Sequence, residues 1–585
     1  AIVLASIVNR VVGPPMRLDA FASDLFLWLT MFSVAAALRR GAHLRVTAIV
    51  SRLPEGLQRQ CEATAAVAVF LFAALMLLPA DRNMIAHFGA LAPQGVQESL
   101  RFAALYVGFA LMALVAALQI AQRIDVGDLL VGVNAVCLTG AALFIGKPLL
   151  LSLGNAGLVF FALLLGMGVA LGVPVAFCFG LATLAYVSSM AGLPLDDVIV
   201  HFDRALSAPV LLAVPLLIVV GYAVHVSGML QAMTTLVKDT VGHVAGGLAY
   251  VLLISLAWVT SISGFRATDL SVFSSVLFPE IRRRGAGERE MVGILTSSTV
   301  FTQIAPPSIV MVLVAAVTGI AVSNIFATAM LPTLLCVALV AVTITVRTSE
   351  DRPEMEDRAG RARLVRAWVL GSSAFVPLLF SWYAVPSGIL TPSEAAVLVI
   401  VYVLAIGATM YGKLDMRALY AATADAGATA GSLLLVVAST GVAVWALAQA
   451  GFVQQLAAVL VQIPGDHWTF MAVSLLVFAL LGATLAGLPA LIFLAPLLTP
   501  IAEQLGIGGT HYVLVAACAT GIGGTLPPFT GGYAWACRIA QVPSSSAGRV
   551  VRAYLGMLIF ALLLLAFLPL TFAVVHTATM GVRNG

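Results

Sequence analysis

Long apolar stretches follow one another along the chain, with only short polar segments between them. A helix that crosses a membrane needs about 20 mainly apolar residues, and most of these stretches approach or exceed that length. Several are too long for one crossing or contain glycine and proline, which predicts broken helices or hairpins that re-enter the membrane. The stretches lie near residues 1–13, 22–38, 63–80, 100–121, 128–146, 151–188, 209–235, 246–278, 291–321, 325–346, 366–383, 388–411, 427–447, 468–500, 511–540 and 550–575. The pattern predicts an all-α polytopic membrane protein.

The composition strengthens this prediction. Of 585 residues, 61% are hydrophobic and 10% are charged, against about 45–50% and about 25% in soluble domains. A soluble enzyme, a disordered protein and a nucleic-acid-binding protein are thereby excluded, and the lipid bilayer is the expected surrounding. The first stretch ends near Val12 and is shorter than a span, so we expect residues to be missing before Ala1.

The few charges predict which loops face the cytoplasm, because lysine and arginine concentrate there. Arginines cluster after the second stretch, from Arg39 to Arg59, and again at 282–284 and within 347–366. The segment 81–99 carries one arginine, and the segment 500–512 carries none. We therefore expect these two segments to lie outside.

The second half repeats the first at an offset of 221 residues. Pro279 pairs with Pro500, Pro306-Pro307 with Pro527-Pro528, and Ser263 with Thr484. Each copy contains a long apolar hairpin with a polar tip, followed by a helix that two prolines interrupt. We place the copies at about 205–346 and 425–575.

The charges around the two hairpins differ. Lys238 and the arginines at 282–284 bound the first, whereas the second is bounded by 465–467 and Glu503, with no lysine or arginine. The first hairpin is therefore expected to open to the cytoplasm and the second to the outside. Inverted repeats with paired discontinuous helices are typical of secondary transporters.

The hairpin tips and the proline breaks are the candidate binding site. Half-helix C-termini and unwound carbonyls offer oxygen ligands to a hard cation, and half-helix N-termini attract anions. The alternative is simple kinking of the helices by proline and glycine. The predicted cation ligands are Ser261, Ser263, Gly264, Ala305 and Pro306 in a first site, and Thr484, Gly487, Thr525, Pro527 and Thr530 in a weaker second site.

Two charges fall within the first hairpin. A charge at the bilayer centre is costly, so Arg266 and Asp269 are expected to face a polar cavity. Arg266 either pairs locally with Asp269, three residues away, or binds a substrate carboxylate. The predicted substrate-binding residues are Arg266, Thr268, Asp269, Pro307 and Ser308.

Motifs for catalysis are weak or absent. Thr391 to Glu394 fit a helix capping box with proline at its first helical position. The segment from Gly140 to Lys147 has the wrong spacing for a phosphate loop, and HExxH and GxSxG do not occur. His43 and His511 are isolated and are expected to be polar loop residues. The sequence therefore predicts no enzyme, no catalytic residue, no cofactor and no metal other than the bound cation.

Ordered motifs along nearly the whole chain resemble those of the tripartite ATP-independent periplasmic (TRAP) transporters, with the small and large membrane subunits fused. The first part carries 24–28 (DLFLW), 40–44 (RGAHL) and Leu53-Pro54. The later motifs are 172–177 (GVPVAF), 241–243 (VGH), 246–249 (GGLA), Ser263-Gly264, 306–308 (PPS), 391–396 (TPSEAA) and Pro527-Pro528.

The resemblance implies an importer of a small organic acid, a class that includes sialic acid and dicarboxylates, in the bacterial inner membrane. It implies coupling to sodium ions, an elevator mechanism, and a separate periplasmic substrate-binding protein as partner. Residues 1–122 would be the small, four-helix scaffold subunit and 151–585 the large transport subunit. The segment 123–150 would supply the extra crossing that their fusion requires.

The sequence departs from the family at both hairpin tips. Phe265 and Arg266 stand where many relatives continue with a second serine, and Ala486 stands where many carry an acid. We hypothesise that Arg266 supplies positive charge that a second sodium ion supplies elsewhere. One competing function is an elevator transporter that needs no binding protein, and another is a membrane enzyme or a non-transporting scaffold.

Overall fold

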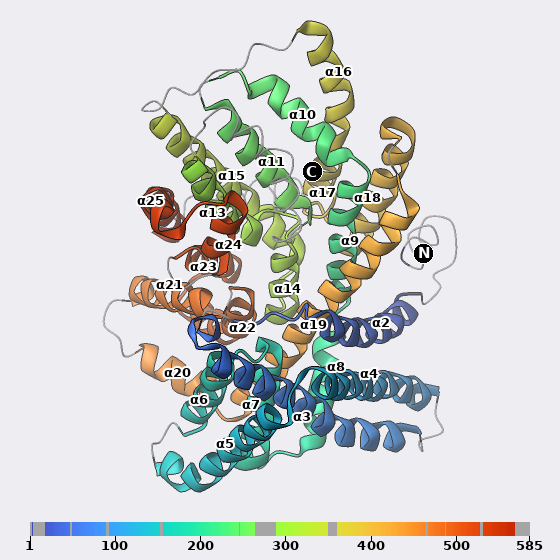
Figure 1. Ribbon diagram of the computed structural model, residues 1–585, viewed down its shortest axis with the longest axis vertical. Helices are drawn as coiled ribbons and strands as arrows, with labels where there is room; N and C mark the ends of the chain where they lie inside the picture. The colour runs from blue at the N-terminus through green and yellow to red at the C-terminus, as the bar shows by residue number, and fades with distance from the viewer. Residues whose placement is uncertain are drawn as a thin grey trace. The chain divides into compact units, whose positions relative to one another are not determined.

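The structure is a computed structural model that describes residues 3, 18–46, 49–88, 93–152, 156–244, 246–263, 288–348, 360–412, 414–461, 466–485, 487–526 and 531–567 (Figure 1). Over these ranges the regular elements are all helices. Ten of these helices are long and apolar enough to cross a membrane. The predicted fold class, an all-α polytopic membrane protein, is confirmed. Of the predicted stretch 1–13, only residue 3 is described.

The chain forms two compact units. The first contains residues 1–212, 427–464 and 492–498, and the second contains 213–426, 465–491 and 499–585. Two long helices, α19 (Met416–Gln449) and α22 (Leu488–Gln504), contribute residues to both units. The boundary between the units follows packing and differs from the expected boundaries between subunits at 122 and 150.

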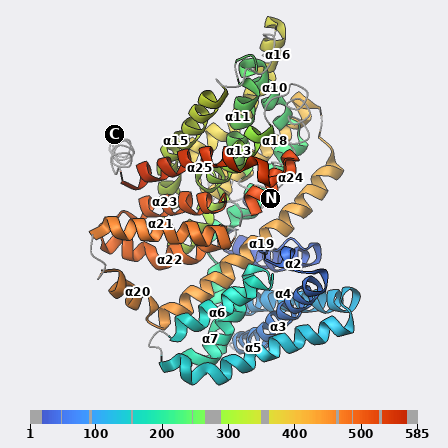
Figure 2. The same cartoon turned by 60° about the vertical axis from the view of Figure 1, so that its left-hand side comes forward.

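The first unit contains the N-terminal helices and α20. They are α2 (Leu18–Arg40), η1 (Val50–Arg52), α3 (Glu55–Phe88), α4 (Pro93–Arg123), α5 (Val126–Ser152), α6 (Ala156–Ala170), α7 (Val175–Tyr186), η2 (Val187–Ala191), α8 (Leu195–Leu206), η3 (Pro209–Leu212) and α20 (Phe452–Val461). Helix α3 packs against α4 and α5, and α5 continues into α6 and α7 (Figure 2). The predicted connecting span at 128–146 lies within α5.

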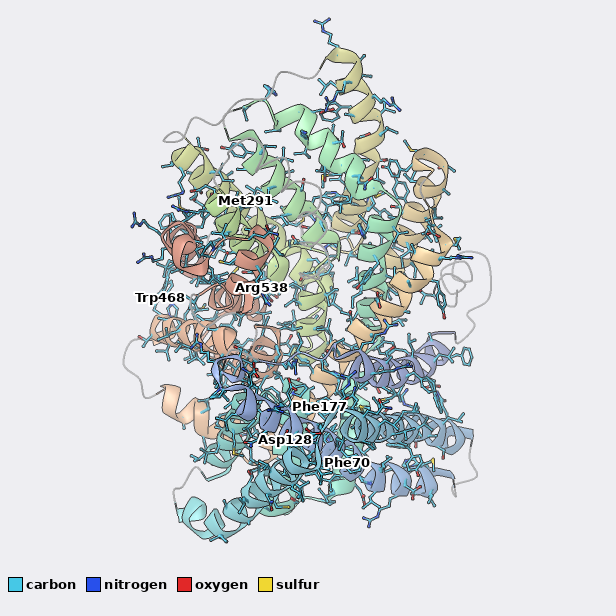
Figure 3. The ribbon with its side chains drawn as sticks, viewed as in Figure 1. Phe70, Asp128, Phe177, Met291, Trp468 and Arg538 are labelled. Carbon is cyan, nitrogen blue, oxygen red and sulfur yellow. The ribbon has the colours of Figure 1, made fainter. Side chains whose placement is uncertain are left out.

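Aromatic rings fill the core of the first unit. The ring of Phe72 on α3 lies 5.5 Å from that of Phe177 on α7 and 5.8 Å from that of Phe109 on α4. Phe202 on α8 continues the cluster at 5.3 Å from Phe109. Figure 3 labels Phe177 within this packing. Each ring removes a large apolar area from contact with water or lipid headgroups, so the cluster fixes how these four helices meet.

A buried ion cluster joins three helices of the same unit. Arg101 on α4 contacts Asp24 on α2 at 2.9 Å and Asp203 on α8 at 2.9 Å. It also donates to the hydroxyl of Ser207, which follows α8. The arginine side chain is 15% exposed, so its charge depends on these partners. A charge at this depth in an apolar chain is tolerated when it is paired in this way.

The second unit contains the first arm of each predicted hairpin and the two half-helices on either side of the first proline break. Its elements are α9 (Ala213–Val226), α10 (Met229–Val241), α11 (Gly247–Ser263), α13 (Glu288–Ile304), α14 (Ile309–Thr318), α15 (Val322–Thr348), α16 (Arg361–Gly371), η4 (Ser372–Phe375), α17 (Val376–Ala384), α18 (Pro392–Ile406), η5 (Gly407–Tyr411), α21 (Asp466–Thr484), α23 (Gly509–Gly523), α24 (Gly531–Ala540) and α25 (Ser544–Phe567). The apolar stretch at 209–235 is divided because Gly228 adopts φ +83° and begins α10.

The helices of the second half recur in the order of the first. Helices α11 and α21 end at Ser263 and Thr484, and α13 and α23 begin at Glu288 and Gly509. Both pairs of positions are 221 residues apart. In the second half, α24 is the counterpart of α14 and α25 is the counterpart of α15. The counterpart of α22 in the first half falls in 264–287, outside the described residues.

Candidate functional site

The first proline break lies between α13 and α14. Ser308 caps α14, because its Oγ accepts a hydrogen bond from the backbone N–H of Val310 at 3.2 Å. The same hydroxyl donates to the carbonyl oxygen of Gln303 at 3.2 Å. On the other side, Trp382 Nε1 donates to the carbonyl oxygen of Pro306 at 2.6 Å. These bonds hold the unwound backbone in place between two half-helices.

Gln303, one turn before the break, is the polar residue that sequence reasoning did not select. Its side chain is 2% exposed, and its Oε1 has no hydrogen-bond partner within the described part of the chain. A buried polar atom without a partner costs about 1–3 kcal/mol. An amide oxygen in this position can coordinate a cation or accept a hydrogen bond from a solute. Its place three residues before Pro306-Pro307 was the available signal.

Helices α13 and α23 cross at equivalent positions of the two repeats. A methyl group added at Gly521 would lie 3.0 Å from the Cα atom of Val300, and these two residues are 221 positions apart. Thr299 also donates from Oγ1 to the carbonyl oxygen of Gly521 at 3.3 Å. A contact between equivalent positions is the contact that a two-fold axis produces.

The second hairpin tip approaches this crossing. Helix α21 ends at Thr484, and Gly487 begins α22 with φ +82°. A methyl group added at Gly487 would lie 3.5 Å from Gln303 Nε2 and 3.9 Å from the carbonyl oxygen of Thr520. The structure therefore brings the tip, the first proline break and α23 together around the amide of Gln303.

Three predicted hydroxyl ligands have local partners. Ser261 donates to the carbonyl oxygen of Ala257 at 2.7 Å, Thr484 donates to that of Leu480 at 3.2 Å, and Thr525 donates to that of Ile522 at 2.6 Å. Both side chains are buried, whereas that of Thr484 is exposed. A hydroxyl that donates one hydrogen bond keeps lone pairs for a cation. These contacts are thus compatible with cation binding.

The remaining predicted positions are only partly described. Among them, Ala305 and Ser308 are buried. The backbone of Ser263 ends α11, and its side chain is not described. Those outside the described residues are Gly264, Arg266, Thr268, Asp269, Pro527 and Thr530. The described residues contain no group of three or more histidine, cysteine, aspartate or glutamate side chains suited to a metal ion.

Two minor predictions have opposite outcomes. The capping box is confirmed: Thr391 N donates to Glu394 Oε2 at 2.8 Å, and Glu394 N donates to Thr391 Oγ1 at 3.3 Å. The prediction that the histidines are polar loop residues is wrong in two ways. His43 lies in a loop but is buried, and His511 lies within α23. Packing against Phe177 buries His43, which the loop sequence alone does not indicate.

Comparison with known families decides the class of protein. The model described as "Tripartite ATP-independent periplasmic transporter, DctM component" matches residues 158–571. The model for the DctQ component of the same transporters matches residues 1–126. The chain belongs to the TRAP transporter family. Both membrane components of a TRAP transporter are present in one chain, so it is a fused permease, as the motifs predicted.

Similar proteins cover both parts. The chain is 23% identical over 563 residues to the isethionate TRAP transporter permease protein DctMQ of Oleidesulfovibrio alaskensis, covering 94% of this chain and 87% of that protein. It is also 23% identical over 587 residues to the sialic acid TRAP transporter permease protein SiaT of Haemophilus influenzae, covering 97% and 95%. The TRAP large permease protein YiaN of Escherichia coli is 24% identical over 418 residues, covering 71% and 97%.

The TRAP assignment settles two broader predictions and supports a third. The chain is a transporter permease and not an enzyme. Its helices make it a multi-pass protein of the inner membrane. The family name implies a periplasmic component that works with the permease.

Proposed function

We propose that this TRAP permease imports a small organic acid by coupling its entry to a cation, with sodium as the expected ion. A separate periplasmic substrate-binding protein delivers the solute, and a transport domain that carries both hairpins moves against a scaffold as an elevator. The observation that supports this most is the meeting of a hairpin tip, a proline break and α23 around the buried Gln303 amide. Broken helices around a midplane site are the usual ion and solute sites of such transporters.

The solute class rests on the relatives. Their names give isethionate, 2,3-diketo-L-gulonate, sialic acid and C4-dicarboxylate as substrates. All four are organic acids that carry a negative charge at neutral pH. An anion of this kind is attracted to half-helix N-termini such as that of α14, which Ser308 caps. We propose Arg266, Thr268, Asp269, Pro307 and Ser308 as the solute contacts.

The same proposal assigns a role to each part of the chain. Residues 1–122 act as the small scaffold subunit, 123–150 as the connecting helix and 151–585 as the transport subunit. The first cation site uses the carbonyl and hydroxyl oxygens of Ser261, Ser263 and Gly264 with those of Ala305 and Pro306. The second, weaker site uses Thr484, Gly487, Thr525, Pro527 and Thr530, and Arg266 supplies positive charge that a second sodium ion supplies elsewhere.

Sodium is expected to stabilise the purified protein. A ligand that binds only the folded state stabilises it by RT ln(1 + [L]/Kd), about 2.7 kcal/mol at 100 times Kd. Thermal unfolding is measured while sodium replaces potassium at constant ionic strength. We expect a saturable rise of the unfolding temperature, which Ser263→Ala reduces because it removes one oxygen ligand of the first site.

Ser255→Ala is the matched control for this sodium test. Ser255 lies on the same helix, α11, is buried, and its Oγ has no hydrogen-bond partner among the described residues. It should keep the full sodium response. An undiminished response in Ser263→Ala would remove that residue from the site, and a wild-type protein that responds equally to both ions would overturn sodium coupling at this site.

Replacing Gln303 with leucine is expected to separate stability from transport. The change removes a buried amide whose oxygen is unpaired, so the unfolding temperature should stay the same or rise. Transport should fall about tenfold or more, because a hydrogen bond or ligand contact to a charged group contributes about 1.5–3 kcal/mol. The measurement is solute uptake into proteoliposomes with the binding protein present, beside thermal unfolding.

Ser255→Ala also serves as the control for uptake, since it removes another buried polar atom from the same unit. Wild-type uptake by Gln303→Leu would place Gln303 outside the transport pathway. A large loss of stability in that variant would mean instead that its amide serves the packing of α13 against α23.

A further inference from the structure

A cavity of about 500 Å³ lies in the first unit. The end of α2, the beginning of α3, the end of α4 and the turn before α7 enclose it. Four arginines line it, together with one carboxylate, and these residues are Arg39, Arg40, Arg45, Arg123 and Glu62. A cavity with this excess of positive charge concentrates anions from its surroundings.

The charges in this cavity are largely uncompensated. Arg39, Arg45 and Arg123 form no ion pair with any residue that the structure describes. Each guanidinium carries five N–H donors and is suited to bidentate binding of a phosphate or carboxylate. Arginine near the cytoplasmic end of a span also serves as a topology signal, which by itself requires no cavity. All four arginine residues are exposed and line an open cavity, and their gathering around one cavity therefore needs a further reason.

His43 provides an independent indication of a ligand. Its side chain lines the cavity and is buried, with the ring packed edge-on against Phe177 at 5.2 Å between centroids. Neither ring nitrogen makes a well-formed hydrogen bond within the described ranges. Burial lowers the pKa of His43 to about 4, against a smaller opposing effect of the backbone of Val34, so the ring is neutral and retains one N–H donor. A buried donor of this kind costs free energy until an acceptor occupies the cavity.

The position of the cavity at the ends of two predicted membrane spans indicates where that acceptor comes from. The apolar spans Phe21–Arg40 and Gln97–Arg123 both end at arginines beside it. Leu38, Val69 and Leu171 line another part of the same cavity. Arginines at the end of membrane spans lie at the level of lipid headgroups, and the apolar wall continues toward the hydrocarbon region.

We propose that this cavity binds the phosphate headgroup of an anionic phospholipid, with the arginines contacting the phosphate oxygens and His43 donating its N–H. Leu38 and Val69 then face the first carbons of the acyl chain. Because the cavity is built from α2, α3, α4 and the turn before α7, the bound lipid ties the small-subunit part to the beginning of the large one.

The test uses the purified full chain in detergent and three probes: dioctanoyl phosphatidylglycerol, dioctanoyl phosphatidylcholine and inorganic phosphate. Thermal unfolding is followed while each probe is titrated. We expect a saturable stabilisation by phosphatidylglycerol and a much smaller one by the other two. Arg45→Gln and Arg123→Gln should each weaken phosphatidylglycerol binding about fivefold, since an arginine near an anionic headgroup contributes about 1 kcal/mol.

Arg59→Gln is the matched control. It removes the same charge, but Arg59 is exposed on α3 and does not line the cavity. His43→Phe keeps a ring against Phe177, should unfold no earlier than the wild type without lipid, and should respond less to phosphatidylglycerol. Equal stabilisation by phosphatidylglycerol and phosphatidylcholine, or by inorganic phosphate, would overturn the lipid assignment. Equal weakening in Arg59→Gln would mean that the attraction is a general surface effect and would overturn the site.

Discussion

Replacing Arg101 with leucine is expected to destabilise the first unit by about 3 kcal/mol, because it leaves two partly buried carboxylates without their counter-ion. Arg101 joins Asp24 and Asp203 at 2.9 Å each, and the two aspartate side chains are 23% and 16% exposed. Exposed ion pairs contribute far less, about 0–1 kcal/mol. Thermal or denaturant unfolding of the purified protein measures the loss.

The counter-ion explanation makes a second, sharper prediction. The triple variant with Asp24, Asp203 and Arg101 all replaced by leucine should recover most of the lost stability, because no buried charge remains unpaired. Arg59→Leu, at an exposed position of the same unit, should have little effect. If Arg101→Leu alone costs no more than Arg59→Leu, the ion cluster contributes nothing to holding α2, α4 and α8.

Replacing Gly523 with alanine is expected to force α21 and α23 apart. The added methyl group would lie 2.0 Å from the carbonyl oxygen of Ala479 and 2.8 Å from its carbonyl carbon. Both are backbone atoms, so no side-chain rotation relieves the contact. Overpacking typically costs about 1–3 kcal/mol, and the displaced α23 would also move Thr520 away from Gly487. We expect a lower unfolding temperature together with a strong loss of uptake.

Gly556 offers the matched control for this substitution. It lies in α25 of the same unit, and nothing lies within 4 Å of an added methyl group. Alanine there should be neutral or should stabilise by about 0.5–1 kcal/mol, because glycine weakens a helix interior. A Gly523→Ala protein that is as stable and active as Gly556→Ala would contradict the close approach of α21 to α23.

Local patterns in the sequence were sufficient for the features that depend on neighbours along the chain. The capping box at Thr391 and Glu394 follows from two residues three positions apart. The apolar stretches predicted that the elements are helices, and the offset of 221 agrees with the ends of α11 and α21. Helix boundaries were less accurate. Helix α20 was not predicted, because its ten residues form no stretch long enough to span a membrane.

Only the tertiary structure decided which polar groups lose their contact with solvent. Gln303 and His43 stand in segments that the sequence marked, yet burial and the missing hydrogen-bond partners depend on helices distant in the chain. The same holds for Gly431, where an added methyl group would lie 2.4 Å from the backbone of Ser33 and separate α19 from α2. Hydrophobic periodicity is a local property, whereas burial, ion pairing and cavities arise from contacts between distant segments. The sequence by itself therefore determined the class of the protein and the helices that form it, and the packing of those helices decided where unpaired donors and charges meet.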